Sequence, residues 1–191
     1  MKKISLHIIF LFSMLNGFAQ KDFAYCKAGL SLLLGEAQTS DDLTVLPALT
    51  IAPGFRIIKT KEFSLTTDFP ISLGVSNKNE DFRFGVDAPA LLNLNFGFTS
   101  SKQSTANLGI SFGAGIGYHY CYNEYYNPYN NEEYDELSVA GYVFQTGIFF
   151  RDKFGGKGLS GGGIKISFMT NSKSAPVQKK VFGISLLATE I

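Results

Sequence analysis

The 191-residue chain contains no tryptophan, two cysteines and two histidines, and its formal net charge at pH 7 is only +1. The small charge excludes a broad basic surface of the kind that binds nucleic acid. Beyond residue 20 no stretch of about 18 consecutive apolar residues occurs, which excludes a helical membrane span there. The abundant residues are glycine (20), phenylalanine (18) and tyrosine (9), a composition that favours β-structure with many turns.

The first 19 residues have the features of a cleaved signal peptide. Two lysines form a basic start, residues 4–15 form a short apolar run, and Gly17 and Ala19 supply small residues at the −3 and −1 positions. We therefore expect cleavage before Gln20, which leaves a single exported domain of residues 20–191. A retained membrane anchor is the alternative, although the apolar run is short for a span.

The rest of the chain alternates apolar and polar residues with a period of two. In 105–120 the even-numbered residues are apolar or aromatic, and the odd-numbered ones are Thr, Asn, Gly, Ser or His. Since a strand points successive side chains to opposite faces, this stretch predicts one long strand, and its length suits a tilted membrane-spanning strand. The same pattern predicts eight strands, at 23–34, 43–58, 62–75, 82–98, 105–120, 137–150, 159–169 and 180–188.

The connections between these strands are short and include no crossover helix, so successive strands should pair antiparallel. Eight such strands close into an up-and-down β-barrel, which removes exposed sheet edges. Pro47 and Pro53 are expected to cause bulges in the second strand, and Gly161–Gly163 a kink or bulge in the seventh. Cys26 and Cys121 fall on opposite faces of strands far apart in the pattern, so we expect two free thiols.

The composition of the second face predicts which side of the barrel looks outward. This face is mostly Gly, Ser, Thr and Asn, unlike the charge-rich exterior of a soluble protein. We therefore expect an all-β, eight-stranded antiparallel up-and-down transmembrane β-barrel whose apolar face meets outer-membrane lipid. Alternating long and short connections, with 35–42, 76–81, 123–136 and 171–178 as the outer loops, agree with this. The reversed arrangement, a soluble periplasmic lipocalin-like barrel around an apolar ligand, is the alternative.

The few charged residues of the small polar face form a candidate interior network. An unpaired charge in a narrow interior is costly, so we expect these groups to pair and to close the lumen. A small channel lined by the same charges is the alternative. The candidate network consists of Lys27, Arg56, Asp68, Arg83, Asp87 and Lys165.

The predicted loop 123–136 and its flanks hold eight of the nine tyrosines. Tyrosine gives a large contact area at low entropic cost, so this region is a candidate patch for an extracellular glycan or protein. An aromatic girdle beside a solvated acidic loop is the alternative. A Ca²⁺ site from Glu132, Glu133, Asp135 and Glu136 is a weaker one, because the acid spacing lacks the EF-hand pattern. The candidate patch consists of Tyr122, Tyr125, Tyr126, Tyr129 and Tyr134.

Catalysis would require a nucleophile and a base near the outer rim. His119 is the only histidine after residue 20, and Ser138 could lie on the neighbouring strand. A single histidine fits a polar lumen residue better, so we expect no enzymatic activity, no metal and no cofactor. The run Gly113–Gly117 lies within a predicted strand with no helix after it, which excludes a nucleotide-binding loop.

Three segments resemble the small outer-membrane β-barrel proteins of the OmpA-like and OmpX-like kind. They are Phe-Pro-Ile-Ser-Leu-Gly-Val-Ser at 69–76, Ala-Leu-Leu-Asn-Leu-Asn-Phe-Gly at 90–97, and Gly-Ile-Ser-Phe-Gly-Ala-Gly-Ile-Gly at 109–117. The similarity covers essentially all of 20–191 and implies a monomer in the cell outer membrane with a structural or surface-interaction role. The chain departs from these barrels at its end, because they often finish in an aromatic residue that assists assembly and this chain finishes at Ile191.

Overall fold

The computed structural model describes residues 23–36, 43–78, 81–101, 103–127, 131–152, 160–171 and 180–190. All regular elements in this part of the chain are β-strands, and it contains no helix long and apolar enough to cross a membrane. The strands are β1 (Ala24–Glu36), β2 (Leu43–Lys59), β3 (Phe63–Asp68), β4 (Ile71–Lys78), β5 (Asp81–Gly97), β6 (Leu108–Asn127), β7 (Asn131–Arg151), β8 (Ser160–Asn171) and β9 (Lys180–Glu190).

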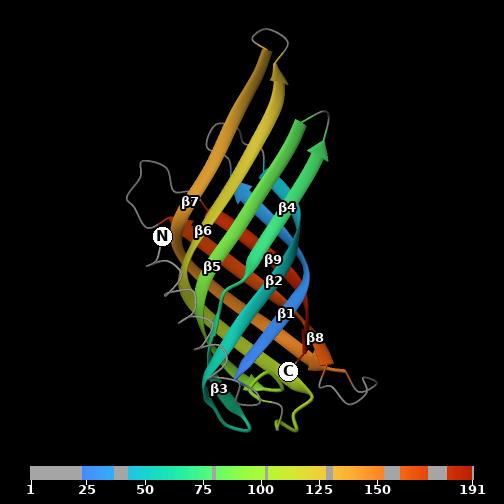
Figure 1. Ribbon diagram of the computed structural model, residues 1–191, viewed down its shortest axis with the longest axis vertical. Helices are drawn as coiled ribbons and strands as arrows, with labels where there is room; N and C mark the ends of the chain where they lie inside the picture. The colour runs from blue at the N-terminus through green and yellow to red at the C-terminus, as the bar shows by residue number, and fades with distance from the viewer. Residues whose placement is uncertain are drawn as a thin grey trace, which may run out of the picture.

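The strands form one closed antiparallel ring (Figure 1). Apart from β3 and β4, which do not pair with each other, strands that follow one another in the sequence are paired, and β1 also pairs with β9, which closes the sheet. The short strands β3 and β4 share one place in the ring, since both pair with β2 on one side and β5 on the other. The fold is therefore the predicted eight-stranded up-and-down barrel, with its third strand broken in two.

The break between β3 and β4 falls at Phe69 and Pro70, within a segment predicted as one strand. Proline lacks the N–H that the ladder requires, so continuous pairing stops there. The N–H of Phe69 instead donates to the carbonyl oxygen of Pro53 at 2.9 Å, which keeps the break close to β2. Asp68 consequently stands at the very end of a strand.

The barrel has two distinct ends. Cys26 in β1 lies opposite Glu190 in β9, so both termini of the described chain lie at one end, together with connections 60–62 and 98–107. We call this the terminal end. The opposite end, where the β4–β5 and β6–β7 hairpins turn, is called the hairpin end (Figure 1).

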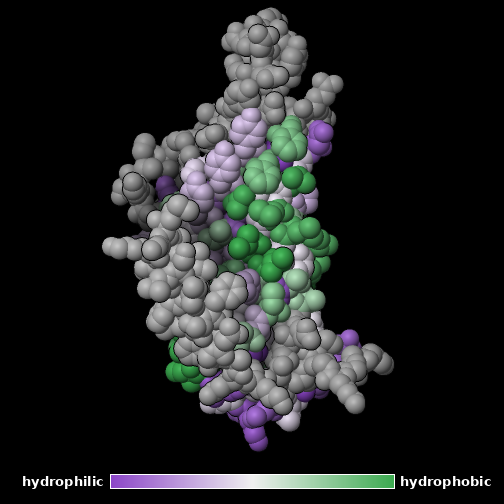
Figure 2. All heavy atoms as spheres, in the orientation of Figure 1, coloured by the Kyte–Doolittle hydropathy of each residue, from purple (hydrophilic) through white to green (hydrophobic). Residues whose placement is uncertain are grey.

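The apolar face of the strands points outward. Leu49 is 67% exposed and Ile116 is 65% exposed, and most large apolar residues of the strands are likewise accessible. Figure 2 shows hydrophobic residues gathered over the middle of the visible outer surface. This orientation excludes the alternative of a lipocalin-like barrel with an apolar interior.

Residues 123–127 and 131–136 are strand and not the predicted loop. β6 and β7 pair without interruption from Leu108 and Phe150 up to Asn127 and Asn131. This hairpin extends past β5, whose last partner in β6 is Glu124. The hairpin therefore rises above its neighbours among the described residues, as Figure 1 shows.

The β5–β6 connection is longer than predicted, and it reverses the direction of one large side chain. The pattern placed Phe98 on the outward face and began the next strand at Thr105, but β5 ends at Gly97 and β6 begins at Leu108. Gly97 has φ 67°, a conformation that glycine adopts without steric cost. The chain turns at this residue, and Phe98 lies in the interior with 0% exposure.

The expected irregularities also lie elsewhere. The register of β2 shifts between Arg56 and Ile58 and not at either proline, which leaves Ile57 and Ile58 both exposed. Residues 161–163 pair in regular register with β7 and β9, without a bulge. Their glycines instead make room for aromatic rings, because a Cβ at Gly163 would lie 2.4 Å from Cδ1 of Phe149.

Cys26 and Cys121 are both free thiols, as expected. Cys26 is exposed on the outer face near the terminal end, and Cys121 is 3% exposed within the interior. Their side chains lie on opposite faces of the barrel wall, which the alternation of the two strands predicts.

Candidate functional site

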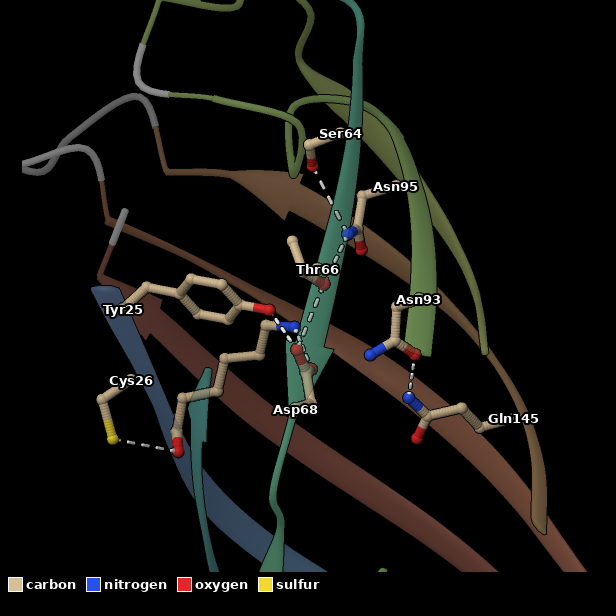
Figure 3. Close-up of polar contacts among 9 residues, drawn as sticks. Tyr25, Cys26, Ser64, Thr66, Asp68, Asn93, Asn95 and Gln145 are labelled. Atoms are coloured by element: carbon tan, nitrogen blue, oxygen red, sulfur yellow. Dashed lines mark hydrogen bonds and ion pairs between the residues drawn. The ribbon is translucent and has the colours of Figure 1, made fainter. Parts of the chain in front are cut away.

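A buried ion pair joins β1 to β3 at the terminal end of the interior (Figure 3). Nζ of Lys27 lies 3.1 Å from Oδ2 of Asp68, and both side chains are at least nine-tenths buried. The hydroxyl group of Tyr25 donates to Oδ1 of Asp68, and Thr66 donates to the same oxygen at 3.2 Å. Asp68 therefore has partners for both of its oxygens, as a buried carboxylate requires.

Gly54 allows this contact across the intervening strand. It lies between Tyr25 and Asp68 in the register of β1, β2 and β3. A Cβ at this position would lie 2.6 Å from Cζ of Tyr25 and 2.9 Å from Oδ1 of Asp68. The absence of a side chain in β2 therefore lets two side chains from β1 and β3 meet.

Two cations contact the ring of Tyr25. Cζ of Arg56 lies 4.6 Å from the ring centroid and Nζ of Lys27 lies 4.9 Å from it. Lys27 also lies 5.3 Å from the ring of Phe149. The carboxylate of Asp68 thus compensates a cluster with two positive charges, in which aromatic faces supply further favourable contacts.

The other charges of the predicted network lie nearer the hairpin end. Nδ1 of His119 lies 3.5 Å from Oδ1 of Asp87, and His119 is 2% exposed. Lys165 is buried and lines a small cavity together with Asp87. Arg83 is half-buried and stands farther along β5, opposite Ser76. The structure therefore brings Lys27, Arg56 and Asp68 into one cluster and places Asp87 beside His119. Lys165 lies between these groups and interacts electrostatically with Lys27, Asp68 and Asp87.

Uncharged polar side chains fill the middle of the interior. Ser31 donates to Ser185 at 2.7 Å and contacts the hydroxyl of Thr50. Thr50 and Ser72 are joined at 2.8 Å, so one chain of hydroxyl contacts crosses β9, β1, β2 and β4. These small groups are hydrogen-bond partners for one another, which suits the narrow interior of an eight-stranded barrel.

Amide side chains form the corresponding contacts on the opposite wall. The Nε2 group of Gln145 in β7 donates to Oδ1 of Asn93 in β5 (Figure 3). Asn95 donates to Thr66 at 3.0 Å and to Ser64 at 3.4 Å. The second set connects β5 to β3, where Thr66 in turn contacts Asp68.

Apolar side chains close the interior on both sides of this polar layer. Phe98, Phe149 and Leu187 form a buried cluster toward the terminal end. The guanidinium group of Arg151 lies 5.1 Å from the ring of Phe98 and donates to the carbonyl oxygen of Ser104. Arg151 therefore contacts two residues of the β5–β6 connection at the terminal end. The clusters nearer the hairpin end consist of Leu33, Leu46 and Ala48, and of Leu91, Cys121, Val139, Val143, Met169 and Val181.

A cavity of about 20 Å³ lies between these layers. A cavity of roughly this size holds one water molecule, and a conducting pore needs a continuous path. The side chains of the described interior are therefore closely packed around this cavity.

The predicted histidine and serine pair is not assembled. His119 points into the interior, whereas Ser138 is exposed on the outer face and donates to the hydroxyl of Tyr118 at 3.1 Å. The strand wall separates the two groups, so they cannot act as nucleophile and base.

The candidate tyrosine patch lies mostly on the projecting hairpin. In register, Tyr122 stands opposite Glu136, Tyr125 opposite Glu133, Tyr126 opposite Glu132, and Tyr134 opposite Glu124. Tyr129 lies outside the described residues, and so do the side chains that were considered for a Ca²⁺ site. Where side chains are described, no group of three or more His, Cys, Asp or Glu is placed to hold a metal ion.

The sequence pattern missed Tyr25 as a partner of Asp68, and it missed Gln145 as a partner of Asn93. It also overlooked the inward-facing apolar residues that close the interior, such as Leu33 and Leu46. The alternation did place Tyr25 on the polar face, but only the register of three strands shows that it meets Asp68.

Two solved structures resemble this barrel. The crystal structure of Neisserial surface protein A (NspA) matches with a TM-score of 0.52 and 10% sequence identity, over 87% of this chain and 94% of that chain. The structure of Ail, the attachment invasion locus protein of Yersinia pestis, in complex with the heparin analogue sucrose octasulfate, matches with a TM-score of 0.48 and 10% identity. That match covers 90% of this chain and 99% of that one.

No protein-family model matches the chain, and no curated protein matches it in sequence. At 10% identity, the likeness to NspA is a likeness of fold. Together with the closed ring and the outward apolar face, it shows the outer-membrane β-barrel fold.

Proposed function

We propose that the protein is an integral outer-membrane barrel of the OmpA-like and OmpX-like kind, exported by a signal peptide that is removed before Gln20. The single observation that carries this proposal is the exposed apolar face of the closed sheet. A soluble protein rarely exposes a continuous apolar surface of this extent to water. In a membrane, lipid tails cover such a surface, so it is not exposed to water. The chain acts as a monomer without catalysis, and its packed interior makes it a closed barrel that does not conduct ions.

The six interior charges have a structural role in this proposal. The pair of Lys27 with Asp68 and the proximity of Asp87 to His119 support it. Charges held against partners in a buried interior fix the relative positions of strands, because a shift of register would leave them unpaired.

The membrane location can be tested by heat modifiability. In a Gram-negative expression host, we expect the full-length chain in the outer-membrane fraction, with an unheated SDS-gel band that shifts on boiling. The shift arises because the closed ladder of hydrogen bonds resists SDS until heat opens it. Mass spectrometry of the same band should give an N-terminus at Gln20. Recovery in the soluble periplasmic extract without a shift would overturn the proposed location.

The surface role belongs to the β6–β7 hairpin, which extends past Glu124 without a β5 partner. The hairpin strands carry Glu124, Glu132, Glu133, Asp135 and Glu136, and residues 118–150 contain no lysine or arginine. Such a segment favours a neutral or basic partner and disfavours a polyanionic glycan, since like charges repel. A protein surface or a neutral glycan that stacks on tyrosine is the partner class that this composition supports.

Shortening the hairpin tests this role without opening the barrel. Asn123 and Asp135 are register partners, so an Asn-Gly turn placed directly between them keeps the remaining ladder in register. We expect unchanged heat modifiability and loss of binding to arrays of neutral glycans and of proteins with graded isoelectric points. A second variant keeps the hairpin length and replaces its tyrosines with serine, which should also abolish binding if the tyrosine side chains make the contact. The replaced residues are Tyr122, Tyr125, Tyr126, Tyr129 and Tyr134. Retained binding in both variants would place the interaction elsewhere.

A further inference from the structure

The outer wall of the barrel contains a groove of about 540 Å³ across β5, β6 and β7. Its shape follows from alternating side-chain sizes in two adjacent rows of the register. One row is Ala88, Tyr118 and Ala140, and the next is Ala90, Ile116 and Tyr142. Alanines on β5 therefore form a trough beside the larger side chains of β6 and β7. The residues that line the groove are Ala88, Ala90, Ile116, Gly117, Tyr118, Ala140, Gly141 and Tyr142.

The two ends of the groove differ in polarity. Toward the terminal end, the next row contains Leu92, which is 49% exposed, and Phe144, which is 54% exposed. The groove is thus continuous with the apolar outer surface on that side. Toward the hairpin end, Ser138 donates to the hydroxyl of Tyr118 at 3.1 Å. One end is therefore purely apolar, and the other presents two hydroxyl groups.

We propose that this groove binds one acyl chain of a bilayer lipid, whose polar head contacts the hydroxyl groups of Tyr118 and Ser138. The inference rests on the proposed membrane location. An amphiphile fits because its tail matches the apolar trough and its head matches the hydroxyl end. Tyrosine is enriched where lipid tails meet headgroups, with its ring in the apolar layer and its hydroxyl group in the polar one. The groove volume lies within the range of about 300–1,000 Å³ that is typical of small-molecule sites.

The concave shape distinguishes this lipid from the other lipids around the barrel. Burial from water does not favour one lipid-facing surface over another inside a bilayer, so preference arises from close packing and hydrogen bonds. A chain in the trough touches β5 and β6 at once, whereas a chain on a convex wall touches one row of side chains. The lipid in the groove should therefore remain bound when a mild detergent removes the others.

The test counts lipids on the full-length barrel after extraction from membranes with a mild non-ionic detergent. Native mass spectrometry of the wild type should show one bound phospholipid per chain. Ala88→Phe with Ala140→Phe fills the trough and should reduce the retained lipid by about tenfold or more, because the acyl chain loses its close packing against β5 and β6. Ala28→Phe is the matched control, because Ala28 is exposed on β1, away from the groove strands β5, β6 and β7, and its variant should retain the lipid.

A second variant tests the polar end of the groove, and it does not require the barrel to accommodate a larger side chain. Tyr118→Phe keeps the ring and removes only the hydroxyl group, so retention should fall about fivefold, the effect of one hydrogen bond. Equal lipid retention in the wild type and the filled variant would overturn the proposal. A mass spectrum of the wild type that shows only bound detergent would also overturn it. So would a dimer of the chain that is lost in the filled variant, because the groove would then be an interface between two copies. Loss of the heat shift in the wild type would instead contradict the membrane location.

Discussion

Replacing Asp68 with alanine should lower the free energy of unfolding by about 3–5 kcal/mol, because it leaves a buried cation without its partner. The ammonium group of Lys27 lies 3.1 Å from Asp68, and the guanidinium group of Arg56 packs on the same tyrosine ring. Both cations are buried, since Lys27 is 6% exposed and Arg56 is 4% exposed. Urea titration of the detergent-solubilised barrel, followed by the loss of heat modifiability, measures the change.

Two further variants separate charge from packing in this cluster. Glu62→Gln neutralises an exposed carboxylate that directly precedes β3, and it should change stability by less than about 0.5 kcal/mol. Lys27→Met with Asp68→Leu removes the ion pair but keeps the guanidinium group of Arg56, so the double variant should recover part of the loss caused by Asp68→Ala. A loss from Asp68→Ala as small as that of the control would mean that the pair contributes nothing to stability.

Replacing Phe98 with alanine should cost about 3–5 kcal/mol, the usual range for deleting a fully buried aromatic ring. Phe98 is 0% exposed and packs with Phe149 and Leu187 at the terminal end of the interior. Deletion of the ring would also remove the surface on which Arg151 rests. The same urea titration measures this loss.

Phe96 provides a matched control only two residues away. It is 43% exposed on the outer face, and its ring lies 5.5 Å from that of Phe63. Phe96→Ala should cost about 1 kcal/mol, since roughly half of its surface is already exposed. Similar losses for the two variants would contradict the placement of Phe98 inside the barrel.

The architecture could be predicted from the sequence because alternation with a period of two is a local property that survives wherever one face meets lipid and the other the interior. Phe98 shows where the pattern fails, since a single positive φ at Gly97 exchanges the two faces. The region 123–136 shows a second limit. The hairpin rises beyond the apolar outer surface, so neither of its faces has to be apolar, and its strands have the composition of a loop.

The contacts of the candidate interior site were only partly predictable. Alternation identifies Lys27, Asp68 and Asp87 as inward-facing, but it does not say which of them meet. That depends on register across strands, on the break at Pro70 and on the missing side chain of Gly54. Tyr25 joins Asp68 only because all three conditions hold, and none of them can be read from a single strand.

The pairing of β1 with β9 has a consequence for the kinetics of assembly. Ser31 and Ser185 make a hydrogen bond across 154 residues of chain, so the last seam of the ring closes the longest loop in the molecule. Contacts of such high sequence separation form slowly, because the chain loses its entropy before the seam can stabilise it. Until then, β1 and β9 are two unpaired edges that can add strands from other chains. The chain is therefore most prone to aggregate before β1 and β9 pair and close the ring.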